Sequence, residues 1–298
     1  LHLSIRRQRQ MCIRDRCQKG AKNTIQITNT VFLSGRLPIP EEPEEQRKIA
    51  ECLSSLDEII KVEIRNLDDL RTHKSVLAQQ IFPCEGKVMP RLRFPEFRDG
   101  PKWVSGSLSE ISKIKSGGTP SRTNHEYWNG DIPWVTTSLI DSNVIMKAEE
   151  HITRAGLDAS AAKIFPRGTL LMAMYGQGKT RGKVALLGIE AATNQACAAI
   201  LVNENMVSTK FVYQNLASRY EEVRKISNPG GQENLSAGLI NGIPFSYPES
   251  RAEQQAIIDV LAFADEVIDT QSQKVEALKM HKRGLSQRLF VIPAEGTI

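Results

Sequence analysis

The sequence has no long apolar run, and its few cysteines are not paired. The longest apolar stretches, such as residues 169–175, are far shorter than the roughly 20 residues that a membrane-spanning helix needs. Five scattered cysteines without a Cys-x2-Cys pair indicate neither a disulfide framework nor a zinc site. We therefore expect a protein without a membrane segment that works in a reducing cytoplasm.

Catalytic and metal-binding motifs are also missing. The sequence contains no Gly-x-Ser-x-Gly, no His-Glu-x-x-His and no clustered pair of carboxylates, and its five histidines lack ligand spacing. Gly178-Lys179-Thr180 ends like a nucleotide-binding P-loop, but Ala173 stands where that loop needs its first glycine. Asn228-Pro-Gly-Gly231 is not the Asn/Asp-Pro-Pro-aromatic motif of amino-methyltransferases. We predict no catalytic residue, no metal ion and no bound cofactor.

Charge is distributed unevenly along the chain, whose formal net charge is +5. Residues 1–22 carry +6, residues 23–86 carry −4, residues 87–240 carry +5 and residues 241–298 carry −2. A basic middle flanked by acidic segments is expected if the middle binds phosphate and the flanks bind protein. A net charge of +5 is also unremarkable for a domain of this size.

The most informative feature is a motif that occurs twice, 208 residues apart. Pro40-x4-Glu45-Gln46 opens one amphipathic segment, and Pro248-x4-Glu253-Gln254 opens its copy. Two copies so far apart do not form a solenoid, so they bracket an inserted domain. Identical residues continue through both copies at the same offset: Ile49, Leu53, Asp57, Glu58, Ile60, Leu70, His73, Lys74, Leu77, Gln79 and Phe82 match Ile257, Leu261, Asp265, Glu266, Ile268, Leu278, His281, Lys282, Leu285, Gln287 and Phe290.

Each copy has the 3.5-residue apolar period of a coiled-coil seam. Neither run contains proline, and Gly284 is the only glycine, so each copy is predicted to form one helix on the order of 60 Å long. An exposed apolar stripe of that length needs a partner, and the other copy is the nearest candidate. The predicted seam residues are Ile49, Leu53, Leu56, Ile60, Leu67, Leu70, Leu77, Ile257, Leu261, Ile268, Val275, Leu278 and Leu285.

Polar residues in the seam predict how the two helices are oriented. Glu63 and Gln271 lie near the two midpoints, whereas Lys74 and Lys282 lie near the two C-terminal ends. A parallel pair would place the lysines face to face, while an antiparallel pair separates them and lets Glu63 hydrogen bond with Gln271. We therefore predict an antiparallel coiled coil; the alternative is that each helix packs on a separate globular core.

Between the two copies the sequence predicts a domain of alternating strands and turns that starts near Trp103. Predicted strands cover residues 132–135, 169–175, 182–187 and 196–202, and a helix is predicted over 209–226. Residues 88–97 contain two prolines and are predicted to be an extended linker. The fold class is therefore α+β: one globular domain and two long helices.

Two loops of this domain carry candidate DNA-binding residues. The glycine-rich segment 175–183 is predicted to be a hairpin loop that presents basic side chains to phosphates; the alternative is a solvated turn with incidental basic residues. Amide side chains follow the glycines of the loop 228–236, where they can pair with adenine or satisfy their own backbone. Trp134 is expected to pack in the core. The candidate DNA-binding residues are Gln177, Lys179, Thr180, Arg181, Lys183, Gln232, Asn234 and Arg122.

Residues 1–22 require a separate interpretation. Residues 1–16 show no helical or strand period and no apolar core of a signal peptide, and they resemble translated adapter or vector sequence. We therefore expect 1–22 to be non-native or disordered; the alternative is a basic arm that binds nucleic acid.

Several motifs together resemble the specificity subunits of type I restriction–modification systems. They occur in that family's order and are Pro90-Arg-Leu-Arg-Phe-Pro-Glu-Phe97, Ser116-Gly-Gly-Thr-Pro-Ser121, Tyr127-Trp-Asn-Gly-Asp-Ile-Pro-Trp-Val135, Phe165-Pro-Arg-Gly-Thr169, Thr193-Asn-Gln195 and the paired Pro-x4-Glu-Gln helices. The resemblance implies target recognition domains that each read half of a split site in double-stranded DNA. It implies two antiparallel helices that dock modification subunits and, through them, restriction subunits. It leaves S-adenosylmethionine, magnesium and ATP to those partners, so this chain is expected not to be an enzyme.

The chain departs from the family pattern because it has both helices but one recognition domain. We expect an N-terminally truncated subunit with residues 23–40 as the remnant of a first recognition domain. The expected segments are helix 41–83, linker 84–100, recognition domain 101–245, helix 246–292 and tail 293–298. The competing function is an oligomerisation or adaptor protein whose middle domain binds another protein.

Overall fold

The computed structural model describes residues 39–84, 86–141, 144–176, 180–226 and 234–290. The chain divides into two compact units, one formed by residues 1–71 and 266–298 and the other by residues 72–265. The expectations for residues 1–38 and for the tail 293–298 lie outside the described residues. None of the helices in the described ranges is long and apolar enough to cross a membrane.

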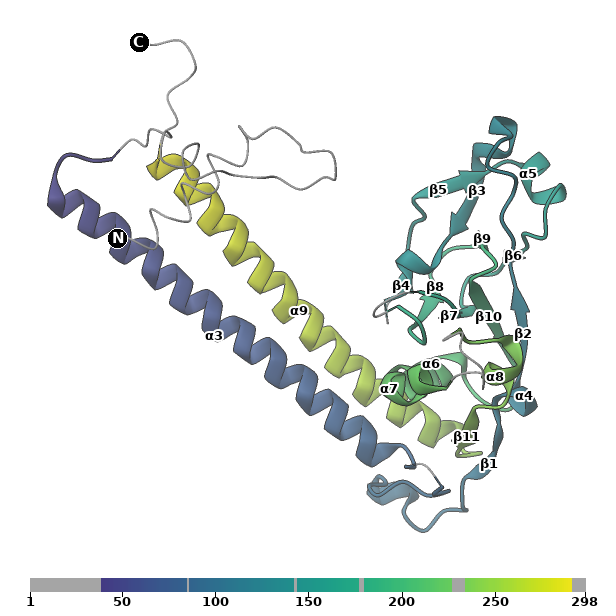
Figure 1. Ribbon diagram of the computed structural model, residues 1–298. Coiled ribbons are helices and arrows are strands. Elements are labelled where there is room, and N and C mark those ends of the chain that lie inside the picture. Colours follow the sequence, from purple (N-terminus) through teal and green to yellow (C-terminus); the bar gives the residue numbers. More distant parts are fainter. Residues whose placement is uncertain (1–38, 85, 142–143, 177–179, 227–233, 291–298) are drawn as a thin grey trace. The chain divides into compact units, whose positions relative to one another are not determined.

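Two helices of 39 residues each, α3 (Pro43–Ile81) and α9 (Arg251–Leu289), correspond to the two copies of the repeat (Figure 1). Pro43 stands at the start of α3, where its missing N–H costs no helical hydrogen bond. Pro83 follows its end, because the residue before a proline disfavours helical geometry. Ser250 caps α9 by accepting from the backbone N–H of Glu253 at 3.3 Å. Both observed helices are a few residues shorter than predicted.

In the unit of residues 1–71 and 266–298, the two helices contact each other through polar side chains. The Gln271 Nε2 donates to the Glu63 Oε2 at 2.7 Å, so the predicted hydrogen bond is confirmed. The Lys274 Nζ donates to the Glu63 Oε1 at 2.7 Å, and Lys282 pairs with Asp57. Residue numbers fall along α9 as they rise along α3, so these contacts run in antiparallel order.

The seam positions predicted from the apolar period are buried or half-buried without exception. Buried examples are Leu53, Ile60 and Leu67 in α3. Several apolar residues outside the predicted seam are exposed, namely Ile59, Val62, Phe263 and Met280. The heptad period therefore identified which face of each helix is covered.

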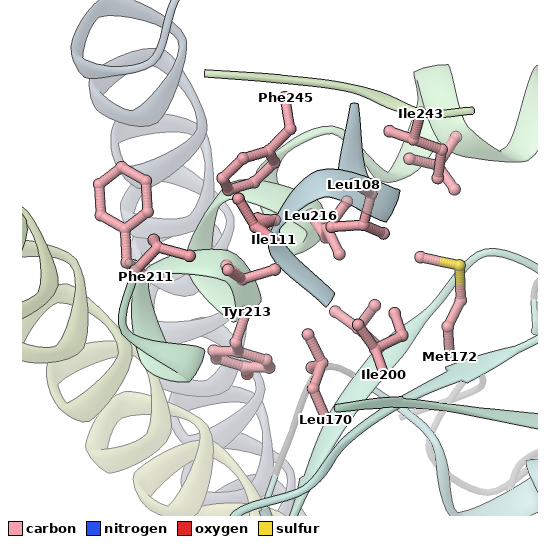
Figure 2. Packing of buried hydrophobic residues seen from close by; sticks show 14 of the residues in the cluster. Leu108, Ile111, Leu170, Met172, Ile200, Phe211, Tyr213, Leu216, Ile243 and Phe245 are labelled. Carbon is pink, nitrogen blue, oxygen red and sulfur yellow. The ribbon is translucent and has the colours of Figure 1, made fainter. Parts of the chain in front are cut away.

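The compact unit 72–265 contains the predicted domain 101–245 together with the adjoining ends of both long helices. Its main core takes Ala78 and Ile81 from α3, Phe82 directly after that helix, and Ile257, Ile258 and Leu261 from α9. Phe211 lies at the centre, with its ring centroid 5.5 Å from that of Phe82 and 5.9 Å from that of Trp103. Figure 2 shows side chains from this core, including Phe211, Leu170 and Ile200. The helix ends belong to this unit because their apolar residues complete its core.

Three sheets build the rest of this unit (Figure 1). β1 (Val104–Ser107) pairs with β11 (Pro244–Tyr247). A five-stranded sheet has the order β2 (Ser112–Ser116), β10 (Cys197–Val202), β7 (Leu170–Ala173), β8 (Val184–Leu187) and β4 (Val144–Ile145). A four-stranded sheet has the order β5 (Glu150–Ile152), β3 (Trp128–Val135), β9 (Ala191–Thr193) and β6 (Ile164–Phe165).

Short helices connect these strands: η1 (Pro95–Phe97), α4 (Leu108–Ile111), η2 (His125–Tyr127), η3 (Thr137–Leu139), α5 (Arg154–Asp158), α6 (Thr209–Ser218), α7 (Tyr220–Lys225) and α8 (Ala237–Asn241). The combination of helix and sheet confirms the predicted mixed class. The single helix predicted over 209–226 is wrong in one respect, because it is divided at Arg219. The Arg219 Nη1 donates to the carbonyl oxygen of Pro244 at 2.7 Å, which ties this break to β11.

Candidate nucleic-acid interface

The glycine-rich segment lies in the connection between the antiparallel strands β7 and β8, as the hairpin prediction requires. Two backbone hydrogen bonds of 2.9 Å close its base: Ala173 N donates to Lys183 O, and Gly182 N donates to Ala173 O. Gly182 has a φ of 83°, a conformation that favours glycine. Gln177 and Lys179 lie outside the described residues.

Arg181 does not have the exposed position expected for a phosphate contact. Its side chain is buried, and its Nη2 donates to the backbone carbonyl of Arg224 at 3.0 Å. A Cβ on Gly182 would lie 3.3 Å from the Arg224 N, so hairpin and helix α7 approach closely here. The expectation of an exposed Arg181 is therefore wrong, because this guanidinium holds the hairpin against α7.

The other basic residue of the hairpin that the structure describes is Lys183. It pairs with Asp141, and 22% of its side chain is exposed. Thr180, which precedes Arg181, is half-buried. Any phosphate that approaches Lys183 must therefore compete with, or displace, the carboxylate of Asp141.

Asn234 lies beside the base of this hairpin, whereas Gln232 falls outside the described residues. Asn234 is half-buried, and the next backbone N–H, that of Leu235, donates to Met174 O at 3.0 Å. The structure thus brings the residues after the second glycine-rich loop to the hairpin, although about 60 residues separate them in the sequence. The periodicity of the sequence could not predict this contact, because periodicity describes only residues close together in the chain.

Arg122 belongs to a second group of side chains, which we call the arginine–tryptophan cluster: Arg122, Trp128, Trp134 and Glu150. The Arg122 Nη2 donates to the Glu150 Oε2 at 2.9 Å, and its guanidinium carbon lies 3.8 Å from the centroid of Trp128. This hydrogen bond lowers the pKa of Glu150, so the carboxylate stays charged at neutral pH. Glu150 was missed in the sequence, because nothing in the sequence marks it as the partner of a residue 28 positions away.

The two tryptophans of the cluster are held by backbone carbonyls. The Trp134 Nε1 donates to Gly118 O, and the Trp128 Nε1 donates to Ser121 O, each at 3.0 Å. Trp134 is buried, which confirms its predicted core position. About half of the Arg122 side chain remains exposed.

The segment Thr193–Ala196 connects this cluster to the hairpin. Gly118 N donates to Thr193 O at 2.9 Å, and the Thr119 Oγ1 donates to the Gln195 Oε1 at 2.5 Å. A Cβ on Gly117 would lie 1.9 Å from Thr193 O, so the loop needs glycine there. On the other side, Met174 N donates to Ala196 O at 2.9 Å. The loop before Arg122, the hairpin and the segment that begins at Asn234 are therefore linked through short backbone contacts.

Across the part of the chain that the structure describes, no three His, Cys, Asp or Glu side chains form a group that could hold an ion. Cys197 is buried, and burial raises the pKa of its thiol to about 12. This thiol is therefore not a reactive nucleophile at neutral pH.

Comparison with known proteins defines the class to which this arrangement belongs. Residues 101–280 match the family model of the type I restriction modification DNA specificity domain. This match covers more than half of the chain, so the chain belongs to that family.

Individual relatives agree with this assignment. The chain is 28% identical over 193 residues to the type I restriction enzyme MjaIX specificity subunit of Methanocaldococcus jannaschii, covering 63% of this chain and 44% of that protein. It is 23% identical over 273 residues to the EcoR124I/EcoR124II specificity subunit of Escherichia coli, covering 88% and 64%. The chain thus spans less than two thirds of either relative.

A solved structure shares the fold. The crystal structure of the HsdS subunit from Thermoanaerobacter tengcongensis superposes with a TM-score of 0.56 at 15% identity, covering 93% of this chain and 66% of the other. At that level of identity the likeness supports the mixed fold of helices and sheets.

Proposed function

We propose that this chain is a DNA-specificity component of a type I restriction–modification complex, in which the domain 101–245 binds one half-site of double-stranded DNA. The observation that carries the proposal is the family match over residues 101–280, which includes this domain and most of α9. Two of the relatives are specificity subunits of type I restriction enzymes. The family match favours this function over a general adaptor protein.

Within the domain, we assign different roles to the candidate residues. Lys183 and Thr180, with Gln177 and Lys179 of the same segment, would contact the DNA backbone and base edges. Arg181 would act by anchoring the hairpin on α7, because its guanidinium already donates to Arg224 O. Arg122 would meet DNA through the exposed part of its side chain, and Asn234 and Gln232 would contribute amides.

The two long helices would form an antiparallel coiled coil that docks modification subunits. The contacts of Glu63 with Gln271 and of Lys282 with Asp57 support this orientation. The exposed apolar residues Ile59, Val62 and Met280 lie outside the seam and could meet such a partner without disturbing the pair. Methyl transfer and cleavage, with S-adenosylmethionine, magnesium and ATP, would belong to the partner subunits.

A salt titration of duplex binding tests the DNA half of the proposal. Fluorescence anisotropy with a library of labelled duplexes should give an affinity that falls steeply as salt rises. Lys183→Ala should weaken binding and reduce the salt slope by about one unit. Lys61→Ala, an exposed lysine of α3, is the matched control and should bind as the wild type does. Indifference of the wild-type chain to DNA at low salt would contradict the proposal.

A further inference from the structure

The turn of residues 194–196, which joins β9 to β10, lies where separate parts of the candidate interface meet. Its Ala196 O accepts from Met174 N, at the base of the hairpin, at 2.9 Å. The residue before the turn, Thr193, accepts through its backbone oxygen from Gly118 N, also at 2.9 Å. The turn therefore contacts two elements that carry candidate DNA-binding residues.

This turn has a fixed backbone. The residues on either side of it, Thr193 and Cys197, are both buried. Within the turn, the Asn194 Oδ1 accepts from Ala196 N at 3.1 Å, and Asn194 N donates to Val135 O at 3.0 Å. A side chain carried by such a turn starts from a defined position, which a precise polar contact requires.

Gln195 is the exposed residue of the turn, whereas Asn194 and Ala196 are half-buried. Its Oε1 accepts from the Thr119 Oγ1 at 2.5 Å. This hydrogen bond places the amide oxygen on the side of Thr119, and the Nε2 group on the opposite side of the amide. An exposed amide at the centre of the candidate interface is therefore oriented by a neighbouring hydroxyl.

The loop that carries Thr119 is itself held in place. The Trp134 Nε1 donates to Gly118 O at 3.0 Å, and Pro120 is buried. The loop lies so close to Thr193 that Gly117 has no room for a Cβ. The Thr119 hydroxyl thus acts on Gln195 from a fixed position.

An oriented carboxamide has a defined partner among the DNA bases. In the major groove an amide pairs bidentately with adenine, because it donates to N7 and accepts from the N6 amino group. An amide oxygen has two lone pairs, so the Gln195 oxygen can accept from Thr119 and from adenine together. Guanine presents acceptors at both N7 and O6, and its O6 would meet the amide oxygen. The arrangement therefore favours adenine over guanine.

We propose that Gln195 reads an adenine in the major groove of the bound half-site, and that Thr119 is the residue that positions its amide. The inference rests on the proposed function, since it requires the domain 101–245 to bind DNA, and it adds the base that one side chain recognises. The sequence did not indicate Gln195, because the turn 194–196 contains neither a basic residue nor a glycine.

Selection from a randomised duplex library tests the proposal. Duplexes bound by the full wild-type chain are sequenced, and one position is expected to prefer adenine by about tenfold. Gln195→Ala should abolish this preference and keep the preferences at other positions. It should leave the affinity for unselected duplexes unchanged, because those contacts are made to phosphates. Asn205→Ala, which changes an exposed amide beyond the other end of β10, is the matched control and should select the same sequences as the wild type.

Two further substitutions separate base reading from a structural role. Gln195→Glu replaces the amide donor by an acceptor, so the preference at the affected position should shift from adenine to cytosine, whose N4 amino group donates. Thr119→Val removes the hydroxyl and should lower the adenine preference about two- to tenfold, because the glutamine must then be ordered on binding. Thr119→Ser keeps a hydroxyl and should retain the preference.

Four outcomes would overturn the inference. Gln195→Ala could keep every base preference of the wild type, or it could lose all of them together with the affinity for unselected duplexes, which would indicate a structural role. The position that depends on Gln195 could prefer a base other than adenine. The wild-type chain could bind duplexes without any base preference, which contradicts base reading but leaves DNA binding intact. A wild-type chain that binds no duplex at low salt would instead contradict the proposed function, and this inference with it.

Discussion

The two copies of the repeat are alike where they face each other and different where they face the rest of the chain. Lys74 pairs with Asp265, and Lys282 pairs with Asp57. Asp57 and Asp265 are equivalent positions of the repeat, so the lysine of each copy binds the same aspartate position of the other copy. At the helix starts, in contrast, Glu253 is buried and Glu45 is exposed. Similar sequence therefore dictates a similar seam, whereas burial at the ends depends on which other segment is present.

Removal of the motif glutamate should give the largest difference in stability loss between the two copies. Glu253→Ala leaves the Arg93 guanidinium buried without its partner, which should lower the free energy of unfolding by about 3–5 kcal/mol. Glu45→Ala removes an exposed side chain and should stay within about 0.5 kcal/mol. Urea unfolding followed by tryptophan fluorescence measures both, and equal losses of unfolding free energy would show that Glu45 and Glu253 have equivalent environments.

Truncation of the equivalent isoleucines should give the next largest difference in stability loss between the two copies. Ile257→Ala creates a cavity in the core of the unit 72–265 and should cost about 2–5 kcal/mol. Ile49→Ala should cost only about 1 kcal/mol, because the side chain is half-buried. Thermal unfolding by calorimetry should rank the two, and a larger loss for Ile49→Ala would mean that the start of α3 is covered.

The two reciprocal lysine–aspartate pairs should differ less, in this case in their coupling energies. Double-mutant cycles to alanine should give about 1 kcal/mol for Lys74 with Asp265 and about 0.5 kcal/mol for Lys282 with Asp57, since both pairs are partly exposed. The first pair should be stronger because Asp265 also accepts from the Gln214 Nε2 at 3.0 Å. Gln214→Ala should bring the two coupling energies together; if it leaves them apart, this explanation is wrong.

Substitution of Glu63, at the centre of the seam, should give the smallest change in stability. This change should depend on pH. Hydrogen bonds from Lys274 and Gln271 lower the pKa of Glu63 below its ordinary value of 4.5. A lowered folded-state pKa stabilises the protein above the unfolded pKa, and this contribution is lost as pH falls through the folded pKa. The melting temperatures of wild type and Glu63→Gln should therefore differ at pH 7 and converge below pH 4.5. A difference that is constant with pH would contradict this assignment.

The helix pair could be predicted from the sequence because its information is local. Seam residues such as Leu53 and Leu261 recur with one period over many turns, and the polar residues Glu63 and Gln271 mark the register. Each of these features can be seen within a window of a few heptads. The prediction was incomplete at the helix ends, where Ile257 and Phe82 enter a core built from other segments.

The candidate interface was harder to predict because its contacts connect distant residues. Arg181 is basic and follows glycines, so it was interpreted as exposed, but its partner is the carbonyl of Arg224, 43 residues further along. Arg122 and Glu150 are likewise brought together by the pairing of β3 with β5. Several short strands, such as β1 and β9, were missed because three or four residues carry too little periodic signal.

The hydrogen bond between Glu63 and Gln271 has a consequence for partner choice. These two positions are equivalent in the repeat, yet one is an acid and the other is an amide. An α3 paired with a second α3 in the same register would place two Glu63 carboxylates together, and their repulsion would oppose that pairing. An α3 paired with α9 places a donor opposite an acceptor. One difference between otherwise matching sequences thus favours unlike helices over like ones, and it makes the central pair a determinant of pairing specificity.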